Sequence, residues 1–156
     1  MSTQVITRSG AEVETFAALL RAHAETTRGF NADLVAEHDL TLSDYEVLLR
    51  LAHAPDRRLR RVDLAEEVLL TPSGITRLLA GLEENGWVER ASCDSDARVT
   101  YAQLTDAGLE KLRVAAKSHV ASIRSLFAER FSPSELEALR DLLQRLPLAE
   151  AASCEP

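Results

Sequence analysis

Residues 61–105 read RVDLAEEVLLTPSGITRLLAGLEENGWVERASCDSDARVTYAQLT, and this stretch decides the fold. It predicts two short helices, around 62–68 and over 72–85, joined by a tight turn. Alternating apolar and polar residues at 87–90 and 100–104 then predict the two strands of a β-hairpin with a charged tip. This order of elements indicates a winged helix-turn-helix.

The second of these helices has well-defined ends. Thr71 is a suitable N-cap, and Pro72 suits the first helical position because its missing N–H would have no helical partner there. Gly86 tolerates the left-handed conformation that commonly ends a helix.

The exposed face of that helix suits entry into the major groove of double-stranded DNA. Its apolar side carries Ile75, Leu78, Leu79 and Leu82. The opposite face carries Ser73 and Arg77, with Thr76 on its flank, and it is small and polar near the helix N-terminus, where Gly74 also lies. Small residues allow close approach, Arg77 can bond a guanine edge, and Ser73 or Thr76 can bond a base or phosphate. The alternative is a solvated face on a structural helix.

The hairpin is expected to act as the wing. Asp96 and Arg98 are two residues apart, so they project the same way from an extended segment. The aspartate can orient the guanidinium for insertion into the minor groove; a plain surface ion pair is the alternative. Arg90, on the other strand, is expected to reach a phosphate or to be solvated.

Four further arginines precede the first helix of the motif: Arg57, Arg58, Arg60 and Arg61. Arg61 is the best candidate for a phosphate contact because it lies nearest the helix start. The net charge of −7 argues against nucleic acid, but residues 57–98 hold seven arginines and eight acidic residues, a balance of only −1. DNA binding therefore requires the arginines to gather on one DNA-facing surface.

Amphipathic helices flank the motif on both sides. The helix expected over 11–37 carries a heptad-like seam formed by Val13, Phe16, Leu20, His23, Thr27, Phe30 and Leu34. Such a seam packs against another helix, in the same chain or in a partner. Capping boxes are expected at Ser43 with Glu46 and at Ser132 with Glu135, and 56–60 is expected to be a polar connection.

The fold class is therefore mainly α with a small β-hairpin wing. We expect an N-terminal dimerisation helix in 1–40, the winged helix-turn-helix in 41–105, C-terminal dimerisation helices in 106–147, and a flexible tail in 148–156.

The segment DLAEEVLLTPSGITRLLAGLEENGWVER, followed by Asp96-Ala-Arg98 and LTDAG, resembles the MarR family of transcriptional regulators. The detailed likeness covers about 59–108. It implies a homodimer, joined through its N- and C-terminal helices, that represses transcription by binding a pseudo-palindromic operator. It places Ser73, Thr76 and Arg77 on the recognition helix.

The resemblance also implies release of DNA by a small aromatic effector. The candidates for that pocket are His23, His38, Tyr45, Arg50, His53 and His119. They form no recognisable constellation, and a lone histidine on a helix is more often packed or hydrogen-bonded than a ligand contact.

Other classes of function have less support. We expect no cofactor, metal site or catalytic residue, since Cys93 has no oriented base in the sequence. No run approaches the ~18 apolar residues of a membrane span, and the N-terminus lacks a signal pattern, so a cytoplasmic location is expected. A protein-interaction module on the same fold, which the charge of −7 would suit, remains the alternative.

Overall fold

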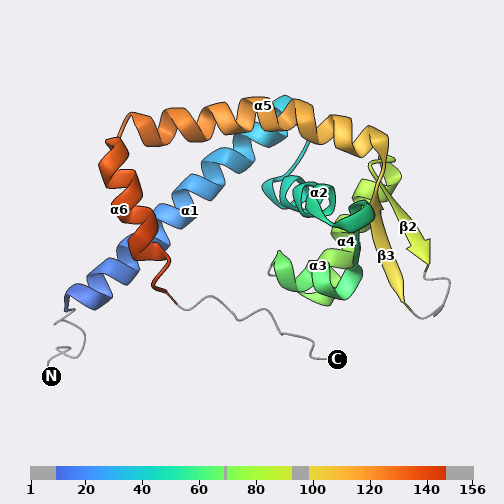
Figure 1. Cartoon of the computed structure of the whole chain (residues 1–156), viewed down its shortest axis with the longest axis horizontal. Helices are drawn as coiled ribbons and strands as arrows, with labels where there is room; N and C mark the ends of the chain where they lie inside the picture. The colour runs from blue at the N-terminus through green and yellow to red at the C-terminus, as the bar shows by residue number, and fades with distance from the viewer. Residues whose placement is uncertain (1–9, 69, 93–98, 147–156) are drawn as a thin grey trace, which may run out of the picture. The chain divides into compact units, whose positions relative to one another are not determined.

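The structure is a computed structural model that describes residues 10–68, 70–92 and 99–146. The chain forms two compact units, Met1–His119 and Val120–Pro156. The elements, in order (Figure 1), are α1 Ala11–His38, α2 Leu42–His53, a 3-10 turn Pro55–Arg57, β1 Arg58–Arg60, α3 Arg61–Glu67, α4 Pro72–Glu84, β2 Val88–Ser92, β3 Thr100–Leu104, α5 Asp106–Ala128 and α6 Pro133–Leu143. The expected class, mainly helical with a small wing, is confirmed.

The sheet has three antiparallel strands in the order β1-β3-β2, one more than the expected hairpin. The interpretation of 56–60 as a polar connection was wrong, because these residues hold part of the 3-10 turn and all of β1. Asp56 and Arg57 have φ values of 52° and 55°, and they turn the chain so that Arg60 pairs with Tyr101 of β3. A strand of three residues is too short to show periodicity in the sequence.

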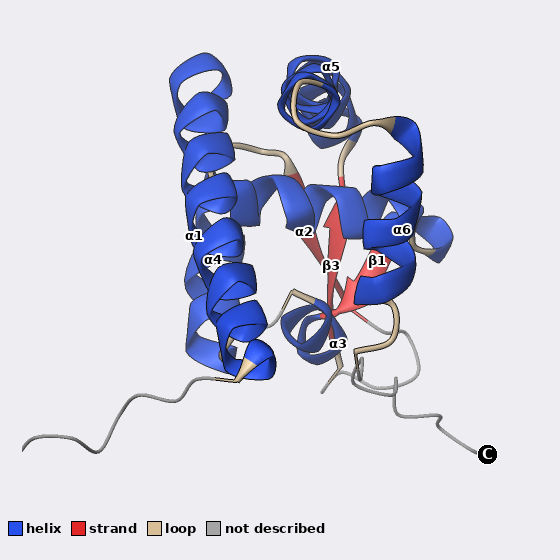
Figure 2. Ribbon diagram, turned by 90° about the vertical axis from the view of Figure 1, so that its left-hand side faces the viewer, coloured by secondary structure: helices blue, strands red, loops and turns tan. Residues whose placement is uncertain are grey.

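The core of the first unit lies where α2, α3 and α4 contact the sheet (Figure 2). Its fully buried side chains include Val47, Leu48, Leu51, Leu64 and Leu79. The apolar face predicted for the second helix of the turn motif is therefore the face that enters this core.

The ends of α4 are confirmed. The Thr71 hydroxyl accepts a hydrogen bond from the Gly74 N–H at 3.1 Å, Pro72 is the first helical residue, and Gly86 has a φ of 72°. The left-handed conformation at Gly86 lets the chain leave the helix directly for β2.

Of the two expected capping boxes, the one at Ser132 and Glu135 is confirmed and the one at Ser43 is wrong. Helix α2 begins at Leu42 with Thr41 as its N-cap, paired reciprocally with Asp44. The Leu42 N–H donates to Asn31 Oδ1 of α1 at 2.9 Å. This contact with α1 favours the start of α2 at Leu42. The sequence around the cap does not reveal the contact, because Asn31 lies on another helix.

The N-terminal part of α1 presents its apolar seam to the surface. Leu34 is buried in the first unit, whereas Phe16 is 59% exposed and Leu20 is 52% exposed. In the second unit, α6 has no buried residue and Leu142 is 54% exposed. Among the described residues, no helix is long and apolar enough to cross a membrane.

Candidate nucleic-acid interface

Helix α4 has one buried face and one exposed polar face. Ile75, Leu79 and Leu82 are buried in the core. Ser73, Thr76 and Arg77 are exposed, so the core holds the helix while its polar face points to solvent. Within the described ranges, no carboxylate forms an ion pair with Arg77, and its guanidinium is available to a base or a phosphate.

The small polar residues of α4 are held by local bonds at its first turn. The Thr76 hydroxyl donates to the Pro72 carbonyl oxygen at 2.8 Å, and its oxygen can still accept a hydrogen bond. The Ser73 hydroxyl lies 3.2 Å from that of Thr71. A Cβ added at Gly74 would lie 3.1 Å from the Thr71 hydroxyl oxygen, so glycine here leaves room for the cap itself.

Arg61 and Arg90 both face Glu83 at the C-terminal end of α4. The Arg90 Nε donates to both carboxylate oxygens of Glu83, at 3.3 and 3.2 Å, and the Arg61 Nη2 lies 3.9 Å from Glu83 Oε1. From the sequence, Arg61 is the best phosphate candidate of its cluster, and Arg90 is expected to reach a phosphate or to be solvated. The structure pairs both with Glu83. Glu83 is 22 residues from Arg61 along the chain, and no local pattern links them.

The remaining arginines of the cluster before α3 are also held within the fold. Arg57 pairs with Asp106 at 2.9 Å, and Arg60 pairs with Asp63 through two bonds of 2.6 and 2.7 Å. The guanidinium of Arg58 lies 5.3 Å from the centre of the Tyr101 ring. Arg57, Arg58 and Arg60 therefore contact carboxylates and a ring within the fold.

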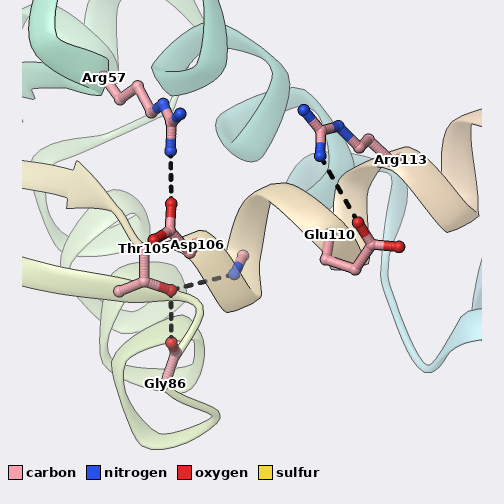
Figure 3. A network of polar contacts seen from close by, with 7 residues as sticks. Arg57, Gly86, Thr105, Asp106, Glu110 and Arg113 are labelled. Carbon is pink, nitrogen blue, oxygen red and sulfur yellow. Dashed lines mark hydrogen bonds and ion pairs between the residues drawn. The ribbon is translucent and has the colours of Figure 1, made fainter.

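A set of polar bonds joins the end of α4 to the start of α5 (Figure 3). The Thr105 hydroxyl donates to the Gly86 carbonyl oxygen at 2.7 Å and accepts from the Gly108 N–H at 3.0 Å. The Arg57–Asp106 pair adds a link from the 3-10 turn to the same helix end. These bonds hold β2, β3 and α4 in one arrangement.

The tip of the wing lies outside the described residues, and with it Cys93, Asp96 and Arg98. The strands that lead to the tip are described as far as Ser92, which pairs with Thr100.

Three of the effector candidates lie at the surface. His23, Arg50 and His53 are exposed. Arg50 lies 3.9 Å from Glu67, and His53 Nδ1 is 2.8 Å from the Leu49 carbonyl oxygen.

Two of the candidates, Tyr45 and His119, meet in an aromatic group that Phe30 completes. The His119 ring is edge-on to both, with centroid distances of 4.7 Å to Tyr45 and 5.3 Å to Phe30. Burial raises the pKa of Tyr45 and lowers that of His119. Nearby, His38 Nε2 lies 2.6 Å from the Ser118 hydroxyl. The signal in the sequence was the place of Phe30 in the heptad-like seam.

Comparison with known proteins places these features in a family. Residues 38–99 match the model described as "MarR family". The repressor YetL of Bacillus subtilis is 31% identical over 115 residues, which cover 71% of this chain and 68% of YetL. The chain belongs to the MarR family.

Two further relatives of this MarR-family chain extend the likeness to nearly its full length. The regulator MhqR of Bacillus subtilis is 29% identical over 133 residues, covering 85% of this chain and 89% of MhqR. Sco3205 of Streptomyces coelicolor, solved in complex with DNA, is 31% identical with a TM-score of 0.80, covering 91% of this chain and 89% of Sco3205. The chain is therefore a transcriptional regulator of the MarR type and not an enzyme.

Proposed function

We propose that this MarR-family regulator represses transcription by binding a pseudo-palindromic DNA operator as a homodimer. The observation that carries the proposal is the exposed polar face of α4, with Ser73, Thr76 and Arg77 around its first turns. Among the described residues, no carboxylate pairs with Arg77. The N-terminal part of a helix is the part that enters the major groove in helix-turn-helix proteins. The solved complex of Sco3205 with DNA supports the same use of this chain.

Two apolar surfaces support assembly into a homodimer. The seam of α1 exposes Phe16 and Leu20, and α6 exposes Leu142 and Leu143. Exposed apolar side chains in such runs are typical of surfaces that a partner covers. Release of DNA by a small aromatic effector and a cytoplasmic location stay predictions.

Binding to the intergenic DNA beside the protein's own coding region tests the proposal. We expect a gel-shift complex that weakens steeply as salt rises, because phosphate contacts release counterions. Arg77→Ala is expected to cost about 1–3 kcal/mol of binding free energy through the loss of a base contact. Arg113→Ala, an exposed arginine on α5, is the matched control and should bind nearly as wild type does.

Equal affinity of the Arg77 variant and wild type would reject α4 as the reading helix. Failure of the wild-type protein to bind any DNA in a salt-dependent way would favour the protein-interaction module instead.

A further inference from the structure

Glu83 is the point at which three elements of the DNA-binding region meet. It lies in the last turn of α4 and contacts Arg61 at the start of α3 and Arg90 in β2. One carboxylate therefore serves two guanidinium groups, which come from segments on either side of α4 in the sequence.

The contact between Glu83 and Arg61 is mostly buried. The side chain of Glu83 is 22% exposed and that of Arg61 is 19% exposed. Within the described part of the chain, Nε and Nη2 of Arg61 are buried without a hydrogen-bond partner. A partly buried guanidinium in this position depends on the nearby negative charge, because a cation out of water is costly without one.

Arg90 is bound differently. Its side chain is 60% exposed, and its Nε hydrogen-bonds to the Glu83 carboxylate. Solvent reaches this arginine, so a phosphate could replace the carboxylate as its partner if the carboxylate were neutral or absent.

We propose that Glu83 is a positioning residue of the DNA interface, which keeps Arg61 and Arg90 from binding phosphate and so limits sequence-independent affinity. The inference rests on the proposed DNA binding. Phosphate contacts carry no sequence information directly and supply essentially all of non-specific binding. A carboxylate that occupies two arginines therefore shifts the balance toward the base-reading residues of α4.

The test compares Glu83→Gln with Glu84→Gln. Both changes remove one negative charge from the end of α4, but Glu84 is exposed and does not face the two arginines. Affinity for a scrambled-sequence duplex and for the operator is measured over about 50–200 mM salt. Circular dichroism melting of each variant checks that it is folded.

We expect Glu83→Gln to bind the scrambled duplex more tightly and to steepen its salt slope by about 0.9 for each arginine released. This corresponds to an additional loss of affinity of about 3.5-fold per released arginine over that salt range. The ratio of operator to scrambled affinity should fall. A purely structural role for Glu83 would weaken both affinities and leave the salt slope unchanged.

Arg90→Ala gives a second test that does not depend on the stability of Glu83→Gln. In the wild-type background it should leave the salt slope unchanged, because Arg90 is held by Glu83. In the Glu83→Gln background it should remove the part of the added slope that Arg90 contributes.

Equal salt slopes for the Glu83 and Glu84 variants would overturn the inference while leaving the proposed function intact. A shallower slope for Arg90→Ala alone would overturn it as well. Absence of wild-type binding to any DNA would overturn both proposals.

Discussion

His119 carries the clearest pH dependence among the described side chains. It is 7% exposed, and its Nδ1 has no hydrogen-bond partner within the described residues. Burial lowers its pKa below the ordinary value of 6.5, and the charges of Asp33 and Glu46 only partly oppose this effect. The unfolded chain therefore binds a proton at a higher pH than the folded one.

The sign of the stability change follows from this difference. Well above pH 6.5, His119 is neutral in both the folded and the unfolded chain, so it does not lower the free energy of unfolding there. The free energy of unfolding decreases as the pH falls through 6.5 toward the pKa of His119 in the folded protein, because in this range mainly the unfolded chain binds the proton. We expect urea unfolding to show a lower free energy of unfolding at about pH 5.5 than at about pH 7.5.

His119→Phe should make this loss smaller, since a phenyl ring keeps the edge-on packing and does not titrate. His53→Gln, at an exposed histidine, is the control and should follow the wild-type dependence. Parallel pH curves for wild type and His119→Phe would contradict the assignment.

At the scale of the elements, two glycines lie in contrasting surroundings. A Cβ built at Gly108 in α5 would overlap the carbonyl oxygen of Trp87, the residue before β2. Nothing lies within 4 Å of a Cβ built at Gly81 in α4. Close contact between α5 and the start of β2 therefore requires glycine at position 108. Gly81 only adds flexibility to α4.

Gly108→Ala is expected to destabilise the protein by about 1–3 kcal/mol, because the helix must move away from the strand. Gly81→Ala should stabilise it by about 0.5–1 kcal/mol, since alanine favours the helix. Thermal melting of the two variants beside wild type checks both. Shifts of the same sign would contradict this account of the α5–β2 contact.

At the scale of the whole molecule, the proposed homodimer depends on the exposed seam of α1. Burial of one large apolar side chain is worth about 1.5–3 kcal/mol. Phe16→Glu or Leu20→Glu should therefore weaken association at least about tenfold and reduce operator affinity with it. Both side chains are exposed within the chain, so each protomer is expected to stay folded.

Light scattering during size-exclusion chromatography measures the mass of each variant. Ala18→Glu adds the same charge on the opposite side of α1, at 100° per residue, and should leave the mass of wild type unchanged. A wild-type monomer, or a Phe16→Glu variant with the dimer mass, would reject this surface as the interface.

The sequence by itself determined the features that depend on neighbours along the chain. Thr71, Pro72 and Gly86 defined the ends of α4, and the spacing of Ile75, Leu79 and Leu82 separated its buried face from its polar one. Local hydrogen bonds and helical periodicity act over a few residues, so they can be recognised without coordinates.

The tertiary structure alone decided which groups from distant segments meet. It added β1 to the sheet, moved the start of α2 to Leu42 beside Asn31, and brought Arg61 and Arg90 to Glu83. The sequence does not indicate which opposite charge will neutralise a charged residue on a helix. That choice depends on how the helices and strands pack. Here it pairs Arg61 and Arg90 with Glu83, whereas Arg77 has no ion pair among the described residues.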